Sequence, residues 1–222
     1  MDIALLGGTG DIGEGLALRF AYHTNHRVLV GSRDPDKAEA KAEGYETELD
    51  SRGVDTTIEG GSNEAMAAKA DVVVLAVPPY YVDDTIEAVS DGLDEGDILV
   101  SPATGMDRDD DGFHYAPPPA GSVTEHAASA VPDGVELVGA FHNLAAGRLA
   151  DLDAPMGIDT FVVGDDADAK DIVTRIAEGI EELRVLDAGG LANAAEVESL
   201  TPLLINVAAN NDGLHDLGLE LK

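Results

Sequence analysis

Short apolar runs recur along the chain and alternate with segments of helical periodicity. The first run, Asp2–Leu6, precedes a cluster of glycines and a helical pattern that includes Leu16 and Phe20. Arg27–Gly31 forms a second run. Asp71–Val77 forms a third, and its lack of polar alternation is typical of a strand buried on both faces of a sheet. This order of strands and helices predicts a mostly parallel, doubly wound α/β sheet with helices on both faces.

The rest of the chain continues the alternation. Asp34 followed by Pro35 is typical of a helix start, and this helix is expected to reach about Asp50. Further strands are expected at 56–59, 97–101, 135–141, 160–163 and 183–186, and further helices at 63–70 (with Asn63 as its cap), 82–89, 122–130, 167–182 and from 197 onward. Residues 102–119, rich in Pro, Gly and acidic residues, are expected to form a long loop near the ligand edge of the sheet.

The formal net charge is −31, from 44 acidic and 13 basic residues. Such a surface argues against binding DNA, RNA or anionic membranes, which require basic patches. We interpret it as an adaptation to high salt, where the screening length falls to about 3 Å at 1 M. The chain has no Cys, which excludes disulfides and thiolate chemistry. The longest apolar run, Val72–Pro79, is too short to span a bilayer, so we expect a soluble cytoplasmic protein.

The glycines after the first strand form a dinucleotide-binding motif. Gly8, Gly10 and Gly13 have the spacing G-x-G-x-x-G between a buried strand and a helix, which is the context that the motif requires. We expect Gly8 to permit the tight turn, Gly10 to let the backbone approach a pyrophosphate, and Gly13 to let helix pack on strand. A glycine-rich turn without a ligand is the alternative. The candidate nucleotide-binding residues of this loop are Gly8, Thr9, Gly10, Asp11, Ile12 and Gly13.

The end of the second strand distinguishes NADP from NAD. An NAD site usually carries Asp or Glu there, whereas this chain has Ser32 and Arg33, followed one helical turn later by Lys37. A carboxylate would repel a 2′-phosphate, whereas these side chains can bind one, with Thr9 close by. We expect the carboxylate of Asp34 to turn back into its own helix. The pattern predicts NADP; solvated surface charges are the alternative.

Little acid–base machinery accompanies this site. None of the five tyrosines has a Lys four residues later, and no Gly-x-Ser-x-Gly is present. Asp107–Gly112 begins like a calcium loop, but Pro118 stands in place of the closing Glu, so we expect no metal site. Val77 and Pro78, followed by Pro79, are expected to border a nicotinamide; an ordinary proline pair at the end of a strand is the alternative. His142 is the one polar group expected near it, as a functional or a structural histidine. Simple hydride exchange with a second redox cofactor is therefore favoured.

On these residues the chain resembles the archaeal F420-dependent NADP oxidoreductases, also called NADPH-dependent F420 reductases, nearly end to end. The resembling segments are Ala4–Gly10 with Gly13 and Gly15, Gly31–Arg33 with Lys37, Val100–Pro102, Leu186–Gly189 and Val197–Leu203. The resemblance implies a Rossmann fold, with NADP and coenzyme F420 as cofactors. It also implies hydride transfer between C4 of the nicotinamide and C5 of the deazaflavin. With the acidic composition it implies a halophilic archaeal source.

The resemblance also implies roles for individual residues. Thr9, Ser32, Arg33 and Lys37 would hold the 2′-phosphate. His142, Ala146, Leu191 and Asn193 would line the deazaflavin pocket, as would Leu204 and Asn206 on the final helix. Arg148 and Arg184 are candidates for binding the anionic tail of F420. We expect residues 1–145 to form the NADP-binding domain and residues 146–222 a smaller α/β part that completes the deazaflavin cleft.

Two other functions remain open at the level of sequence. An NADPH-dependent reductase of a small imine or ketone would need a proton donor, and only His142 or a tyrosine such as Tyr80 could serve. An NADP-sensing protein would bind the nucleotide and a partner without turnover. The apolar composition of the C-terminal helix suggests a homodimer.

Overall fold

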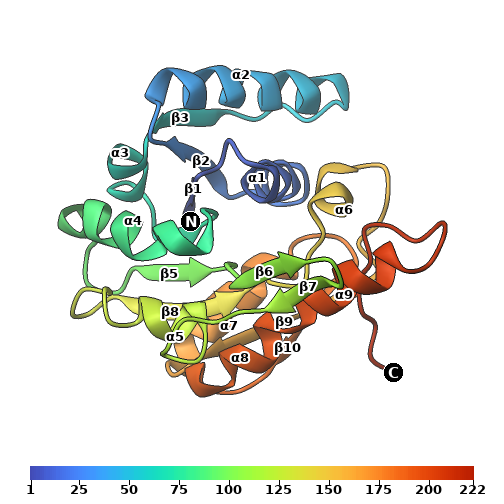
Figure 1. Ribbon diagram of the computed structural model, residues 1–222. Helices are drawn as coiled ribbons and strands as arrows, with labels where there is room; N and C mark the ends of the chain where they lie inside the picture. The colour runs from blue at the N-terminus through green and yellow to red at the C-terminus, as the bar shows by residue number, and fades with distance from the viewer.

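Eight strands of the computed structural model, which describes residues 1–222, form one sheet (Figure 1). These strands are β1 (Asp2–Leu6), β2 (Arg27–Ser32), β3 (Ile58–Ser62), β4 (Val72–Leu75), β5 (Ile98–Ser101), β8 (Glu136–Ala140), β9 (Ile158–Gly164) and β10 (Leu183–Asp187). Their order across the sheet is β10-β9-β8-β5-β4-β1-β2-β3. All neighbours pair in parallel except β8 and β9, which are antiparallel. The predicted mostly parallel Rossmann-type sheet is confirmed.

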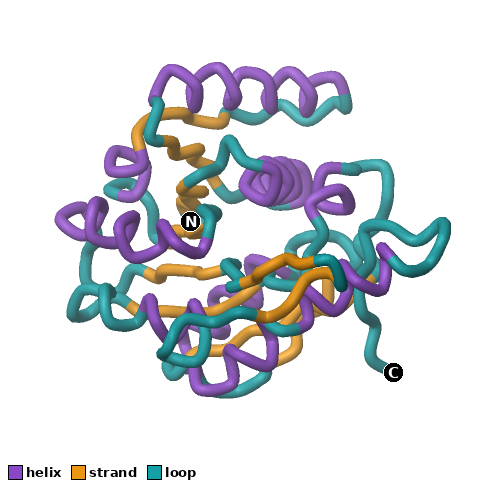
Figure 2. The backbone as a smooth tube through the Cα atoms, viewed as in Figure 1, coloured by secondary structure: helices purple, strands orange, loops and turns teal.

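Helices cover both faces of this sheet (Figure 2). They are α1 (Asp11–His23), α2 (Pro35–Ser51), α3 (Asn63–Ala67), α4 (Val82–Val89), α5 (Val123–Ala127), α6 (Ala146–Ala150), α7 (Ala167–Ala177), α8 (Ala194–Glu198) and α9 (Leu200–Ala209), with 3-10 turns η1 (Pro79–Tyr81), η2 (Ser90–Gly92) and η3 (Leu191–Asn193). Alternate β1 residues enter different cores. Ile3 and Leu5 pack with α1, α2 and α7, whereas Ala4 and Leu6 pack with α3, α4 and α5. This period of two is what a sheet covered on both sides requires.

The helix starts follow capping chemistry. The carboxylate of Asp34 accepts a hydrogen bond from the Lys37 backbone N–H at 3.3 Å, so it caps α2 as expected. The prediction that Asn63 caps the next helix was wrong. Ser62 does so, because its hydroxyl accepts from the Ala65 N–H at 3.1 Å and Asn63 becomes the first helical residue.

The expectation of a long loop over 102–119 was also wrong. The segment contains an antiparallel hairpin, β6 (Met106–Asp109) and β7 (Gly112–Tyr115), closed by Asp110 and Asp111. Met106, Phe113 and Tyr115 share one face of the hairpin but are only half-buried, and an isolated two-stranded hairpin is only marginally stable. The Asn206 side chain on α9 donates to the Phe113 carbonyl at 2.7 Å and accepts from its N–H at 2.9 Å. The hairpin therefore depends on a residue far along the chain, which local patterning does not reveal.

The C-terminal third is built onto the same sheet. β9 and β10 extend it beyond β8, and α6 packs against α1 (Figure 1). The chain then returns along β9, where the Asp159 N–H donates to the Leu219 carbonyl at 2.6 Å. The division into 1–145 and 146–222 stays a prediction. None of the helices combines the length and apolar character needed to cross a membrane.

Candidate functional site

Two pockets adjoin at the carboxyl edge of the sheet, where the chain order reverses between β1 and β4. The smaller has a volume of about 500 Å³ and lies beside the ends of β1 and β2. The larger, about 830 Å³, lies beside the ends of β4, β5 and β8. Both are lined by Gly10 and by Ala76, Val77 and Pro78. A doubly wound sheet binds ligands at such a switch point, so the two pockets form one continuous candidate site.

The glycine loop shapes the boundary between the pockets. Gly7, not Gly8, adopts the left-handed conformation, with φ +77°, which corrects the expected position of the tight turn. A Cβ on Gly8 would lie 2.7 Å from the Leu5 carbonyl oxygen, and one on Gly13 would lie 2.6 Å from the Gly8 Cα. The close packing expected at Gly13 is thus present. Gly10 is the N-cap of α1 and supplies no side-chain cap, so the first N–H groups of the helix are open to a ligand.

Two unpaired cations border the smaller pocket. Arg33 and Lys37 line it together with Thr9 and Ser32. Seven of the 13 basic residues form ion pairs with carboxylates: Arg27, Lys41, Arg52, Lys69, Lys170, Arg184 and Lys222. Neither Arg33 nor Lys37 does so, although the net charge is −31. Arg33 instead lies over the Tyr81 ring, 4.8 Å from its centroid. Leaving two neighbouring cations without carboxylates in so acidic a protein favours an anionic ligand.

Asn63 also lines this pocket. Its Oδ1 is buried beside Gly31 without a hydrogen-bond partner. Unpaired buried polar atoms are rare and costly in native proteins. Glu64 and Asp84 lie on the same wall, so Arg33 and Lys37 are what makes the pocket receptive to an anion.

The larger pocket is mostly apolar and is assembled from distant segments. Of its 27 lining residues, 15 are hydrophobic, and none is Lys or Arg. Its walls come from the α1 start, the segments after β4, β5 and β8, helix α9 and residues Leu214–Leu217. Ile12, Pro78 and Leu204 contribute apolar surface, whereas Thr104 and Thr201 contribute hydroxyls. A pocket of this kind fits a flat aromatic ligand with few polar edges.

The chain leaves β8 through a strained residue at this pocket. Phe141 has φ +68°, which is uncommon for a bulky side chain. Its ring packs edge-on against Phe20, with centroids 6.1 Å apart, and the Leu144 N–H donates to its carbonyl at 3.2 Å. The bend directs residues 142–147 along the pocket wall. Backbone strain of this kind is concentrated at functional sites.

Known proteins with this sequence pattern share one activity in their names. A family model for coenzyme F420-dependent NADP oxidoreductases matches residues 2–105. An F420-dependent NADP reductase of Methanocaldococcus jannaschii is 38% identical over 209 residues, covering 93% of this chain and 92% of that protein. The namesake of Methanothermobacter thermautotrophicus is 38% identical over 214 residues, covering 95% and 90%. This chain belongs to the F420-dependent NADP reductase family.

The fold extends over the full length of a solved relative. A structure from Arthrobacter sp. FB24 superposes with a TM-score of 0.80 at 24% identity, covering 100% of this chain and 99% of that one. Membership of the F420-dependent NADP reductase family confirms the resemblance inferred from the glycine loop, the second strand and the C-terminal segments. The matches do not assign roles to individual residues, so these rest on the geometry.

In this member of the family, His142 lines the larger pocket but is only 4% exposed. Burial lowers the pKa of His142 to about 3, so the imidazole is neutral at physiological pH. Its Nε2 lies 3.4 Å from the Thr124 hydroxyl, which donates to Glu198 at 2.9 Å. Because this hydroxyl has one hydrogen, His142 donates through Nε2. Its Nδ1 is then an acceptor, and it has no partner. His142 is therefore built to accept a hydrogen bond rather than to supply a proton.

Glu198 on α8 holds the histidine's partner in place. It is fully buried, and it accepts hydrogen bonds from the Val123 and Thr124 N–H groups at 3.1 and 2.9 Å. The Tyr115 hydroxyl donates to it at 3.1 Å, which ties β7 to the same carboxylate. Burial raises the pKa of Glu198. One carboxylate thus caps α5, anchors the hairpin and orients Thr124 toward His142.

The structure brings most of the predicted site residues together. Ser32, Arg33, Lys37 and Thr9 gather at the smaller pocket, Val77 and Pro78 border both, and Gly10, Asp11, Ile12, His142, Ala146 and Leu204 line the larger. Leu191 and Asn193 do not line it, since they form η3, where the Asn193 amide donates to the Ala188 carbonyl at 2.7 Å. Asn206 faces the hairpin instead. The residues not foreseen include Thr104, Met106, Thr201, Ile205, Ala208 and His215.

The two arginines considered for an anionic tail are already engaged. Arg184 forms a two-pronged ion pair with the buried Asp159, with both N···O distances 2.6 Å. Arg148 donates to the Asp216 and Met156 carbonyls at 3.0 and 2.9 Å. No group of three His, Asp or Glu side chains lies close enough together to hold a metal ion.

Proposed function

We propose that this protein transfers a hydride between the nicotinamide of NADP(H) and the deazaflavin of coenzyme F420. The observation that carries the proposal is the pair of adjoining pockets. One offers cations and open helix N–H groups, and the other offers a mostly apolar slot. The family to which the chain belongs has this activity in its members' names.

The smaller pocket fits the 2′-phosphate side of NADP. Arg33 and Lys37 would supply charge, and Ser32 and Thr9 hydroxyl donors, to the phosphate oxygens. The N–H groups at the start of α1, beyond the open position at Gly10, would receive the pyrophosphate. Binding the dinucleotide in this direction would place its nicotinamide past Val77 and Pro78, at the entrance to the larger pocket.

The larger pocket would hold the deazaflavin against the nicotinamide. Ile12, Pro78 and Leu204 would exclude water from the two rings, and Ala146 would leave room for them. The bound rings supply the donor and acceptor carbons of the hydride. The chain's own work is to bind, stack and orient them, because closeness and alignment account for much of the rate of such a transfer. The unpaired Nδ1 of His142 and the hydroxyl of Thr201 would contact polar ring edges.

Reduction of an imine or ketone needs a proton as well as a hydride, and neither side chain considered as its donor is suited to the role. His142 is buried and neutral. Tyr80, the tyrosine considered for this role, is 74% exposed and lies outside the larger pocket. We therefore place deazaflavin ahead of a small carbonyl substrate.

Other aspects of the proposal concern the protein's setting. The surface charge of −31 supports adaptation to a saline cytoplasm of an archaeal cell and argues against nucleic-acid partners. Helix α9 supports a homodimer. Its sequence is almost entirely apolar, yet only Pro202 is buried, and Leu203 and Val207 are exposed. Equilibrium sedimentation would test the dimer.

The deciding experiment follows deazaflavin absorbance with purified protein, oxidised F420 and either NADPH or NADH. Bleaching with NADPH and little with NADH is the expected result. Tight NADPH binding without bleaching would refute the deazaflavin assignment and favour a nucleotide-sensing role. Equal rates with NADH would refute the function assigned to Arg33 and Lys37.

A further inference from the structure

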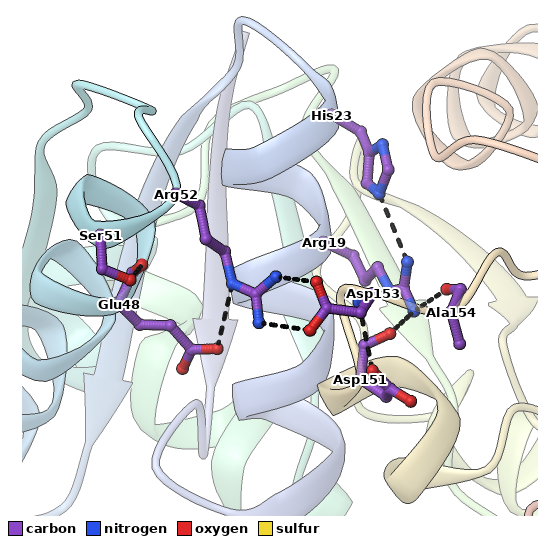
Figure 3. A network of polar contacts seen from close by, with 8 residues as sticks. All are labelled: Arg19, His23, Glu48, Ser51, Arg52, Asp151, Asp153 and Ala154. Carbon is purple, nitrogen blue, oxygen red and sulfur yellow. Dashed lines mark hydrogen bonds and ion pairs between the residues drawn. The ribbon is translucent and has the colours of Figure 1, made fainter.

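A buried arginine joins the two helices that flank the larger pocket (Figure 3). Arg19, on α1, is 1% exposed and forms no ion pair with a carboxylate. Its guanidinium donates to four backbone carbonyls of a segment about 130 residues away. The acceptors and distances are Leu149 at 2.9 Å, Arg148 at 2.7 Å, Asp151 at 2.5 Å and Ala154 at 2.9 Å.

A fifth contact of the Arg19 guanidinium is made with His23. The Nη1 of Arg19 lies 3.4 Å from Nε2 of His23, drawn above Arg19 in Figure 3. Because arginine only donates hydrogen bonds, Nε2 of His23 is the acceptor, and the His23 imidazole is therefore neutral. Burial and then Arg19 itself lower the pKa of His23, which agrees with that state.

Helix α6 cannot hold its place without outside support. It has only 5 residues, no side-chain cap at its N-terminus, and carbonyls at its C-terminal end that lack helical partners. Arg19 satisfies those carbonyls. Gly15 on α1 allows α1 and α6 to pack closely, because a Cβ on this residue would lie 2.4 Å from the Leu149 Cβ.

The segment fixed in this way forms one wall of the larger pocket. Ala145, Ala146 and Gly147 line that pocket, immediately before the carbonyls that Arg19 binds. Gly10, the N-cap of α1, lies on the boundary with the smaller pocket. A single rigid helix therefore links the place where pyrophosphate would bind to the wall against which deazaflavin would lie. Sub-ångström placement matters for a transfer between stacked rings.

We propose that Arg19 is a positioning residue that sets the 145–147 wall of the deazaflavin pocket relative to the dinucleotide loop. This proposal rests on the function proposed above. A lysine cannot replace Arg19. The planar guanidinium of arginine directs its donors to carbonyls on several sides, whereas the compact ammonium group of lysine has only three donors and cannot reach all of them. Arg19 lines neither pocket, so its effect is expected in the geometry of the larger pocket and not in nucleotide binding.

The test uses two variants that act on the same contact from opposite ends. Arg19→Lys removes the fork, and Gly15→Ala keeps Arg19 but displaces Leu149. We expect each to raise the KM for F420, or to lower kcat, by about tenfold, while the Kd for NADPH changes by less than about twofold. Amide hydrogen exchange at 145–154 should accelerate in both, because the wall is released.

Arg52→Gln is the matched control. Arg52 binds the same segment through Asp153, at 2.6 Å, but this pair is exposed (Figure 3), and exposed ion pairs contribute little. We expect this variant to keep wild-type kinetics. If Arg19→Lys and Gly15→Ala bind NADPH normally and also keep the wild-type KM and kcat, the positioning role is refuted. Equal loss of NADPH binding and F420 turnover would refute it too, by showing general destabilisation. Failure of the wild-type protein to reduce F420 would instead refute the proposed function.

Discussion

The two ends of the cleft differ in how the chain builds them. The glycine loop and the cations of the smaller pocket come from two short segments, 7–10 and 32–37, each at the end of a strand, and the rest of its wall comes from 63–64 and 76–88. The larger pocket draws on at least six segments, from Gly10 to Leu217. The first end offers backbone N–H groups and fixed charges, which a local motif can encode. The second end offers an apolar shape, which exists only after distant elements have packed.

The largest expected effect tests the charged end. The double variant Arg33→Ala, Lys37→Ala should lower kcat/KM for NADPH by about 100- to 1000-fold, because a hydrogen bond to a charged group is worth about 1.5–3 kcal/mol. The activity with NADH should not fall, since NADH has no 2′-phosphate. Steady-state rates with F420 and each nucleotide measure the difference. Parallel losses with both nucleotides would show that these residues maintain the loop and do not select the phosphate.

How far the sequence could predict the site follows from the same contrast. Ser32, Arg33 and the glycine motif were recognisable because each follows a strand directly, and parallel strands bring their carboxyl ends to one edge. The sheet was recognisable for a related reason, since unbroken apolar runs such as Val72–Leu75 are typical of buried strands. Here the local pattern and the tertiary structure agree.

The other end could not be predicted in this way. The β6–β7 hairpin is stabilised by Asn206, and the wall at Ala146 by Arg19, and each contact spans more than 90 residues of sequence. Thr201 and Ala208 belong to an apolar helix whose inward face is not marked by polar alternation. Leu191 and Asn193, chosen through the family resemblance, fold away into η3. Packing between distant segments decides these positions, and the periodicity of the sequence does not predict such packing.

The second prediction tests the larger, mostly apolar pocket, which is the shaped end of the cleft. Ala208→Phe places a ring into the apolar slot and should raise the KM for F420 by about 50-fold, given that overpacking costs about 1–3 kcal/mol. Binding of NADPH should be unchanged, because Ala208 does not line the smaller pocket. Fluorescence titration with NADPH and F420 kinetics measure the two effects. A matched substitution on an exposed helix face away from both pockets, Ala40→Phe on α2, should leave both unchanged.

A third prediction concerns the buried histidine of the shaped end. The folded pKa of His142, about 3, lies below its unfolded value of 6.5, so the unfolded chain binds an extra proton at intermediate pH. The stabilisation is complete above pH 6.5 and is lost as pH falls toward 3. Between about pH 7.5 and about pH 5 the wild type should lose about 2 kcal/mol more stability than His142→Gln. Urea unfolding of both proteins measures this.

The comparison between variants isolates this effect. His23 and Glu198, which also have shifted pKa values, are present in both proteins, so their contributions cancel to first order. Identical pH dependence in the two proteins would mean that His142 is not buried and neutral. In that case it could donate a proton, and an imine or ketone substrate would regain support over deazaflavin.

The smallest expected effect tests whether the smaller pocket depends on residues outside the two segments that carry its motif. Arg33 rests on the Tyr81 ring at 4.8 Å, and Tyr81 comes from η1, after β4, not from either glycine-loop segment. A cation–π contact at an exposed site is worth about 0.5–1 kcal/mol, so Tyr81→Leu should lower kcat/KM for NADPH by about two- to fivefold. Rates with NADH should stay constant, and Tyr80→Leu serves as the neighbouring control. An unchanged NADPH rate would show that the two segments suffice. The expected loss would show that even a motif-encoded pocket needs a distant aromatic ring to hold its arginine in place.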